Sequence, residues 1–202
     1  PAAGPFLAAA RAAGVRRVVL LGSLAELPGV PGAAELGRAV RSFPEWAVLR
    51  PSWFMQNFTG THVHAAGIRE EGVIRTATGD GRIGFVDAED IAAVAARALT
   101  DAHAPDTDLV LTGPEALSHD DIAAAVTGVT GRPVEHRRLT REQMRDLLSA
   151  QMPPAFAALL ADMDHAISEG AEDRVTDTVL HVTGRPPGSF RALLEREAER
   201  RG

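Results

Sequence analysis

The stretch WAVLRPSWFMQNF, residues 46–58, decides the fold, because a short apolar run turns there into a cluster of aromatic and amide side chains. Residues 46–50 carry the apolar run, which predicts a strand that ends at Arg50–Pro51. Only 4% of the chain is aromatic, so two aromatic residues placed just after a strand are unusual here. Such a cluster is suited to form the wall of a ligand pocket.

A second strand precedes this stretch. Residues 16–22, RRVVLLG, form a continuous apolar run with β-branched residues, which is typical of a parallel strand buried on both faces. Between the two runs, Leu36, Val40 and Phe43 recur with the period of an amphipathic helix, after a Gly- and Pro-rich loop at 28–32. Strand, helix and strand in this order predict a right-handed βαβ unit.

The remaining elements continue an α/β pattern. We expect strands at 83–86, 108–113 and an edge strand at 134–139, and irregular structure at 59–80. We expect helices at 5–13, after Asp87 and around 177–182, and three more that begin at the N-caps Ser118, Thr140 and Ser189. A further helix should run from Pro153 to Gly170. Its apolar residues are Phe156, Leu159, Leu160, Met163 and Ile167. The predicted fold class is therefore α/β, with a partial parallel sheet flanked by helices and a smaller, mostly helical C-terminal lobe.

Composition excludes several classes of function. The 202 residues have a net charge of −6, which argues against a nucleic-acid partner, and no apolar run approaches the length of a membrane span. The chain has no Cys and no Tyr, and all 21 basic residues are Arg, which excludes thiolate chemistry, a Tyr acid and a Lys Schiff base. The N-terminal stretch does not resemble a signal peptide, so we expect a cytoplasmic protein, and the Ala- and Arg-rich composition indicates a bacterial one.

The carboxyl ends of parallel strands are where open α/β sheets bind ligands. The first strand ends in Gly22 and Ser23, and the second is followed by the aromatic and amide cluster. Within the cluster, flat rings and Met55 supply apolar area, while Gln56 and Asn57 can orient a polar ligand. The alternative is that Trp53, Phe54 and Met55 only pack under the next helix.

Two pairs of side chains could hold a metal. His62 and His64 would share one face of a strand, but no third ligand is evident, so a polar loop is the better interpretation. Asp162 and His165 share one helix face, where solvent exposure is the simpler interpretation. We therefore predict no metal site.

Three charged side chains could serve a pocket. Asp87 could act as a general base, although its role as a helix cap suffices to explain it. Arg50 and Arg82 could bind a phosphate or a carboxylate, although structural ion pairing is more common. The segment Gly79–Asp80–Gly81 predicts a tight turn.

Four segments together resemble the NmrA-like family of atypical short-chain dehydrogenases/reductases, and bacterial relatives of the ergot-alkaloid reductases. They are GVRRVVLLGS (14–23), WAVLRPSWFMQNF (46–58), GDGRIGFVDAEDIAAVAARAL (79–99) and LVLTGPEALSHDDIAAAVTGVTGRPVEHRRLT (109–140). The resemblance implies that 1–112 is the later half of a Rossmann-like NAD(P)-binding domain and that 113–202 is a substrate-binding lobe. It implies NADP or NAD contacts from Gly22, Ser23, Pro51, Ser52, Trp53 and Phe54, and substrate contacts from Met55, Gln56, Asn57 and Phe85.

The chain departs from the family pattern in two ways. Its first strand resembles the fifth strand of the family rather than the strand that precedes the Gly-rich turn, so the half with the adenine-ribose site is absent from these residues. It also lacks the Tyr-x-x-x-Lys pair that supplies a proton in the superfamily, so the catalytic residues stay unknown. The proton would come from water or from the substrate itself.

The resemblance favours an NAD(P)H-dependent oxidoreductase that acts on a small organic substrate. Two alternatives stay open: a non-catalytic NAD(P)-binding redox sensor or regulator, and a cofactor-independent cyclase or isomerase on a truncated scaffold. If the chain is complete, its unfinished sheet edge needs covering, which predicts a homodimer.

Overall fold

A computed structural model describes residues 3–24 and 33–200, and the predicted loop at 28–32 lies outside these ranges. The chain divides into two compact units. The first unit comprises Pro1–Ser52, Ala88–Thr112 and Thr176–Pro187, and the second comprises Trp53–Asp87, Gly113–Val175 and Gly188–Gly202. The chain first passes from the first unit to the second at Ser52–Trp53, inside the stretch WAVLRPSWFMQNF. Within the described ranges, no helix is long and apolar enough to cross a membrane.

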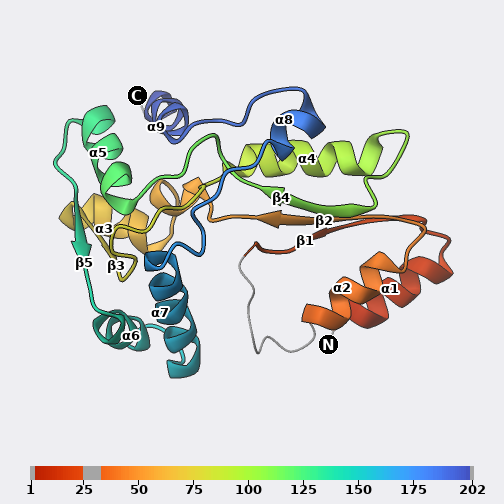
Figure 1. The fold of residues 1–202 in the computed structure, drawn as a ribbon, viewed down its shortest axis with the longest axis horizontal. Helices are drawn as coiled ribbons and strands as arrows, with labels where there is room; N and C mark the ends of the chain where they lie inside the picture. The colour runs from red at the N-terminus through yellow and green to blue at the C-terminus, as the bar shows by residue number, and fades with distance from the viewer. Residues whose placement is uncertain (1–2, 25–32, 201–202) are drawn as a thin grey trace. The chain divides into compact units, whose positions relative to one another are not determined.

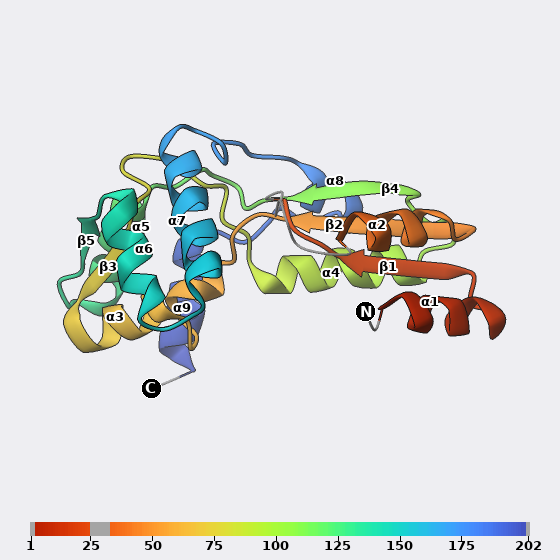
Figure 2. The same ribbon diagram turned by 90° about the horizontal axis from the view of Figure 1, so that it is seen from below.

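The first unit is a three-layer α/β structure. Its parallel sheet has the order β1-β2-β4, with the strands β1 (Arg17–Leu21), β2 (Glu45–Pro51) and β4 (Thr107–Leu111). Figures 1 and 2 show helices on both faces of this sheet, with α4 on one side and α1 and α2 on the other. The helices of this unit are α1 (Ala3–Ala12), α2 (Ala33–Arg41), α4 (Ala88–Thr100) and α8 (Thr178–Thr183). The predicted α/β fold class and the β1–α2–β2 unit are confirmed.

The expectation that the first strand is buried on both faces is wrong. β1 lies at the edge of the described sheet, all but its last residue are half-buried, and Leu21 is 57% exposed. The central strand is β2, where Ala47, Val48 and Leu49 are buried. A continuous apolar run specifies a strand, but its place in the sheet depends on the neighbours it finds.

The second unit is mostly helical around a two-stranded parallel sheet. This sheet pairs β3 (Val73–Thr76) with β5 (Glu135–Arg138), so the predicted edge strand is confirmed. The helices of this unit are η1 (Met55–Phe58), α3 (Val63–Glu71), α5 (His119–Thr130), α6 (Arg141–Ser149), α7 (Pro154–Ser168) and α9 (Phe190–Glu199), as Figure 1 shows. They enclose an apolar core that includes Met55, Phe58 and Phe85.

Two expectations for this unit are wrong. Residues 59–80 are not irregular, because they contain α3 and β3. Residues 83–86 form only isolated bridges, Phe54↔Val86 and Ile83↔Leu117, rather than a strand. The sequence pattern of residues 59–80 gave only a weak signal for regular structure, because α3 buries only Ala65 and β3 pairs with a strand far along the chain.

The helix caps follow the sequence closely. Ser118 and Thr140 each form the predicted capping box, with Asp121 and Gln143 respectively. Ser189 caps α9, and Gly131 ends α5 in the left-handed region at φ 69°. These contacts lie within four residues of one another, which is why the sequence alone specifies them.

We expect Ser118→Ala to lower the free energy of unfolding by about 1 kcal/mol, because it removes the acceptor of the Asp121 amide. In a chain of this length that corresponds to a fall of about 2–4 °C in melting temperature. Ser118→Thr, which keeps the hydroxyl, is the matched variant and should melt near the wild type. Equal melting temperatures for wild type and Ser118→Ala would contradict a stabilising cap.

The buried face of α7 differs from the predicted one. Its buried residues are Ala157, Ala161, Asp164 and Ile167, whereas Phe156 is 49% exposed. The two alanines pack in a cluster with Met144 and Leu148 of α6. Small side chains allow two helices to approach closely, so the two alanines occupy the contact and Leu160 packs beside them, only partly buried.

Candidate functional site

The predicted ligand residues of the first unit lie where parallel strands end. The Gly22 amide donates to the Leu49 carbonyl at 2.8 Å, and the Ser52 amide donates to the Leu111 carbonyl at 2.9 Å. The hydroxyl oxygen of Ser52 is buried and makes no hydrogen bond to any residue that the structure describes. A buried hydroxyl without a partner is unfavourable, so this atom is a candidate for contact with a ligand.

Arg50 has a structural role at the same strand end. Its guanidinium donates to the carbonyl oxygens of Ser23 and Leu24, at 3.3 and 3.2 Å. It therefore fastens the segment after β1 to β2, a structural role in which its partners are backbone carbonyls rather than the expected ion pair.

The aromatic cluster divides between the core and a cavity. Met55 and Phe85 are each 1% exposed and pack in the core of the second unit, and Phe54 bridges to Val86. Trp53 is partly buried against the same core. Packing therefore accounts for much of this cluster, as the alternative expected, and a ligand role for these side chains stays a prediction.

Gln56 belongs to a separate polar contact. Its amide donates to Asp87 at 2.7 Å, and Arg196 of α9 donates to the other carboxylate oxygen at 2.6 Å. The Asp87 side chain is almost completely buried, so this ion pair fixes α9 against the segment before α4. The contact explains Asp87 without a role as general base.

A small cavity in the second unit brings together predicted and unpredicted residues. Its volume is about 10 Å³, which is at the lower limit for one water molecule. It is lined by Trp53, Asn57, Phe58, His64, Ile83, Phe85, His119, Asp164 and Ile167. Such a cavity can receive the polar tip of a molecule, such as a carbonyl oxygen.

His119 is the buried histidine of this cavity. It is the first residue of α5, and its ring lies 5.8 Å from the rings of Phe58, Phe85 and His64. Burial, with the nearby His136, lowers the pKa of His119 from 6.5 to about 3. The imidazole is therefore neutral at pH 7, with one nitrogen that donates and one that accepts.

A chain of hydrogen-bonding side chains leads away from His119. Its Nδ1 lies 2.9 Å from Thr78 Oγ1, which lies 2.7 Å from Thr76 Oγ1, which in turn lies 2.8 Å from His136 Nε2. His136 Nδ1 lies 3.3 Å from Asp120 Oδ2, although the two atoms are not aligned as a hydrogen bond. We call these five residues, from His119 to Asp120, the histidine–threonine chain.

The two ends of the histidine–threonine chain differ in exposure. The side chain of His136 is fully buried, whereas that of Asp120 is 46% exposed and pairs with Arg138 at 2.7 Å. Burial tends to raise the pKa of Asp120, but the hydrogen bond from Arg138 and the nearby ring of His136 outweigh it and lower that pKa. The chain therefore runs from a surface carboxylate to a neutral imidazole in the cavity.

Asp164 is the second titratable group of the cavity. It accepts a hydrogen bond from the Ala77 amide at 2.8 Å and is only 8% exposed. Burial raises the pKa of Asp164 from 3.8 to about 6. A carboxyl and an imidazole in one cavity, with pKa values displaced in opposite directions, are typical of a functional site.

The other histidine and aspartate candidates have structural roles. His62 caps α3 by accepting from the His64 amide, and His64 stacks on Phe58 with 5.5 Å between ring centroids. Burial lowers the pKa of both histidines. The pKa of His64 is lowered more than that of His62, because the neighbouring His119 and His62 also disfavour a positive charge on His64. Asp162 pairs with Arg141 on the exposed side of α7. Among the described residues there is no group of three or more His, Cys, Asp or Glu that could hold a metal ion.

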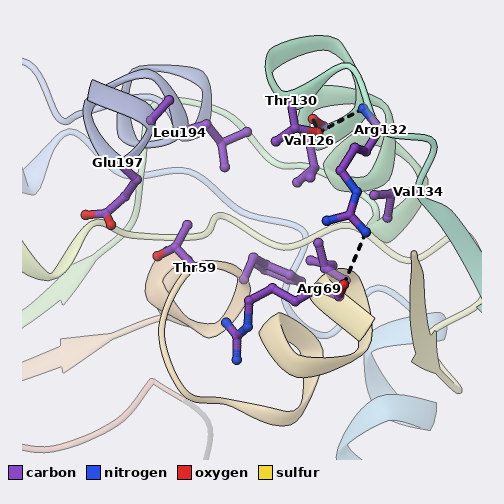
Figure 3. A pocket seen from close by; sticks show the side chains of 11 residues that line it. Thr59, Arg69, Val126, Thr130, Arg132, Val134, Leu194 and Glu197 are labelled. Carbon is purple, nitrogen blue, oxygen red and sulfur yellow. Dashed lines mark hydrogen bonds between the residues drawn. The ribbon is translucent and has the colours of Figure 1, made fainter. Parts of the chain in front are cut away.

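A larger cavity of about 190 Å³ lies between α3, α5 and α9 (Figure 3). Phe58 and Leu194 give it an apolar floor, and Arg132 reaches from the end of α5 to donate to the Arg69 carbonyl at 3.2 Å. Its lining contains no histidine and none of the predicted ligand residues. The smaller cavity is therefore the candidate for chemistry.

Sequence reasoning did not identify His119, His136, Thr76, Thr78 or Asp164. For His119 and Asp164, the sequence pattern did contain a signal. His119 stands three residues before Ile122 and seven before Val126, on the buried stripe of α5. Asp164 continues the buried stripe of Ala157 and Ala161. A polar residue at a core position of an amphipathic helix is informative, because burial of polar groups is unfavourable without partners.

The parallel sheet, the βαβ unit and the strand-end residues define an α/β protein of the nucleotide-binding type. Residues 34–182 match the model of the NmrA-like family, and the chain belongs to that family.

The chain is similar in sequence to an oxidoreductase and to a synthase of other organisms. It is 46% identical over 187 residues to the uncharacterized oxidoreductase YesF of Bacillus subtilis (strain 168), with 92% of this chain and 65% of that protein covered. It is 37% identical over 196 residues to festuclavine synthase II of Penicillium roqueforti (strain FM164), with 95% and 68% covered. The chain thus spans about two thirds of the length of these relatives.

The fold also matches solved structures. A new type of NADPH-dependent quinone oxidoreductase from Escherichia coli aligns with a TM-score of 0.81 and 25% identity, over 96% of this chain and 72% of that one. The same enzyme complexed with NADPH aligns with a TM-score of 0.79.

Proposed function

We propose that the chain is part of an NAD(P)H-dependent oxidoreductase that reduces a small organic substrate. The names of its relatives support this function, since they are oxidoreductases and one is NADPH-dependent. The observation that carries the proposal is the buried, unbonded hydroxyl of Ser52 at the carboxyl end of β2. Ligands of open parallel sheets bind at these ends.

The residues present fit one end of the cofactor. Gly22, Ser23, Pro51 and Ser52 follow neighbouring parallel strands, and Trp53 and Phe54 follow directly in the chain. These six residues would hold the nicotinamide end, which supplies a hydride when bound. Gly79, Gly81 and Gly84 have the G-x-G-x-x-G spacing, but no helix begins there to hold a pyrophosphate, so we assign no residue of this chain to the adenine end.

The substrate would contact the second unit. Asn57 and Phe85 line the small cavity, and Met55 and Gln56 belong to the same segment and orient it through the core and through Asp87. The cavity has room for one polar atom of the substrate, and its aromatic lining excludes bulk water around it. The site therefore suits a molecule with a flat apolar body and a reducible polar tip, such as a quinone.

NADPH titration of the full chain, followed by tryptophan fluorescence, tests the proposal. Trp46→Phe leaves Trp53 as the remaining tryptophan, and we expect saturable quenching of its emission. NADPH consumption with the quinone menadione then tests turnover. No quenching at millimolar NADPH would exclude cofactor binding by this chain, and a cofactor-independent isomerase or cyclase would then be favoured. Quenching without consumption of NADPH by any quinone would favour the redox sensor.

Removing the unbonded hydroxyl of Ser52 should have opposite effects on the stability of the protein and on its affinity for NADPH. We expect Ser52→Ala to raise the free energy of unfolding by about 1 kcal/mol, because it removes a buried polar atom without a partner. The same variant should weaken NADPH binding about fivefold, the value of one ordinary hydrogen bond. Ser149→Ala is the control, since its hydroxyl bonds only the Arg145 carbonyl on an exposed helix face. Unchanged NADPH affinity in Ser52→Ala would remove Ser52 from the site.

The cellular setting of the protein is part of the proposal. A cytoplasmic bacterial enzyme fits the absence of cysteine, and the negative net charge disfavours a nucleic-acid partner. The open edge of β1 supports a further strand or a second copy at that edge. Light scattering of the purified chain distinguishes a dimer from a monomer.

A further inference from the structure

We propose that the histidine–threonine chain is a proton relay, which carries a proton from the surface of the second unit to a substrate atom in the small cavity. The inference rests on the proposed function for the identity of the reaction, but the relay itself is a property of five side chains. The relay supplies a proton donor for the reaction, since the chain has no Tyr to donate a proton.

The geometry meets the requirement of a relay at the three links from His119 to His136. The first three contacts, from His119 to His136, are between 2.7 and 2.9 Å, which are ordinary hydrogen-bond distances. Every member can both give and take a proton, because a hydroxyl and a neutral imidazole each have a donor and an acceptor. The low pKa of His119 keeps its ring neutral, which leaves both functions available at pH 7.

The hydrogen bonds of the chain have two directions in which every threonine donates to one neighbour in the chain and accepts from the other. In the loaded direction, His136 Nε2–H donates to Thr76, Thr76 donates to Thr78, and Thr78 donates to His119 Nδ1. The proton of His119 is then on Nε2, which makes no hydrogen bond to the described residues. In the discharged direction every bond is reversed, and both rings carry their proton on Nδ1.

Transfer converts the loaded direction into the discharged one. His119 Nε2–H gives its proton to the substrate oxygen, while Nδ1 receives the proton of Thr78 Oγ1. Thr78 receives the proton of Thr76, and Thr76 receives the Nε2 proton of His136. The Asp120 carboxylate, which is 46% exposed, takes a proton from water at the surface and passes it to His136 Nδ1. One proton thus enters at the surface and one leaves in the cavity, with no net change in the number of protons that the chain carries.

The link to Asp120 is the one that must move. Its atoms are 3.3 Å apart without hydrogen-bond alignment, whereas the other links are formed. Arg138 holds the Asp120 carboxylate and also pairs with Asp80 at 2.6 Å. A small rotation of the Asp120 side chain would complete the contact, so the link to Asp120 can act as the entry gate.

Other charges around the relay set its pH range. His64 of α3 faces His119 with 5.8 Å between ring centroids, and Asp164 of α7 lines the same cavity. At the other end, Asp80 and Arg138 face Asp120 and His136. Because burial keeps His64, His119 and His136 neutral above their lowered pKa values, we expect the relay to stay intact from neutral pH upward.

The structural alternative is that the histidine–threonine chain only joins β3, β5 and α5. Thr78→Val and Thr78→Ser distinguish the two, because valine keeps the shape without the hydroxyl and serine keeps the hydroxyl. Nitrogen-15 spectra of ring-labelled histidine report the tautomer of each ring without substrate or cofactor. We expect His119 and His136 to share one tautomer in the wild type and in Thr78→Ser. In Thr78→Val the tautomer ratio of His119 should change, because its Nδ1 partner is lost.

The activity measurement follows on the same variants. With NADPH and menadione, we expect Thr78→Val to lower kcat roughly tenfold to a hundredfold at unchanged KM, and Thr78→Ser to stay within about threefold. Unchanged histidine tautomers in Thr78→Val overturn the relay, whatever the activity. An equal loss of kcat in Thr78→Ser and Thr78→Val also overturns it, since the hydroxyl would then be irrelevant. If the chain consumes no NADPH, the proposed function fails, while the tautomer result still decides the relay.

Discussion

Asp164→Asn is expected to stabilise the protein at pH 8 by up to about 3 kcal/mol and to leave its stability nearly unchanged at pH 4. The pKa of Asp164 is raised from 3.8 to about 6 in the folded chain, mainly by burial. A raised pKa favours folding while the carboxyl is protonated, below about pH 4. That contribution is lost as the pH rises through about 6, because the folded state must then bury a carboxylate.

The size of the effect follows from the pKa difference, since each unit corresponds to about 1.4 kcal/mol. An asparagine can still accept the hydrogen bond from the Ala77 amide, but it cannot ionise. Urea denaturation of wild type and variant at pH 4, 6 and 8 measures the difference, which corresponds to about 6–12 °C in melting temperature. His119 titrates in the opposite sense, since its pKa is lowered, but it contributes equally to both proteins and cancels.

Asp162→Asn is the matched control for Asp164→Asn. It is on the same helix, but its side chain is 49% exposed and pairs with Arg141. Exposed pairs contribute little, so we expect a change within about 1 kcal/mol at every pH. An equal gain in Asp164→Asn at pH 4 and pH 8 would contradict a charge effect. A loss of stability at pH 8 would show that the carboxylate is well solvated or paired.

Gly81→Ala is expected to lower the free energy of unfolding by about 3 kcal/mol or more. A Cβ at this position would lie 2.2 Å from the Ile167 carbonyl oxygen and 2.9 Å from that of Thr78. Both are backbone atoms, so no side-chain rotation can relieve the overlap. The Gly81 amide also closes the predicted tight turn by donating to Thr78 at 2.9 Å, which prevents the turn from shifting freely.

Gly128→Ala is the matched control for Gly81→Ala. Gly128 lies inside α5, and a Cβ there meets no atom within 4 Å. Alanine has the higher helix propensity, so we expect stability to be unchanged or raised by up to about 1 kcal/mol. Thermal unfolding of the two variants measures the contrast. A Gly81→Ala protein within 1 kcal/mol of the wild type would show that α7 can move away from the turn. Since Asp164 and Ile167 of α7 line the small cavity, such a shift would also displace Asp164.

The sequence by itself determined the elements whose signals are local. The N-caps Ser118 and Thr140 and the βαβ unit around residues 16–50 are confirmed. Each depends on residues within a few positions of one another or on one continuous apolar run. Such patterns can be recognised in the sequence without knowledge of the tertiary contacts. The family resemblance, carried by whole segments, is confirmed as well.

The strand-end site was only partly readable. Its first-unit residues follow parallel strands as expected, and Ser52 has a free hydroxyl there. Met55 and Phe85, however, pack in the core, because an aromatic or apolar cluster after a strand satisfies burial as well as it walls a pocket. Sequence alone cannot separate these two uses of the same side chains.

Only the tertiary structure decided the chemistry of the small cavity. Thr76 and Thr78 come from β3 and the turn after it, His119 from α5, His136 from β5 and Asp164 from α7. They meet because β3 and β5 pair in parallel although some sixty residues separate them, and because the alanine face of α7 packs inward. Contacts of this range depend on the folding of the whole unit, since no local pattern specifies which distant polar group a buried side chain will find.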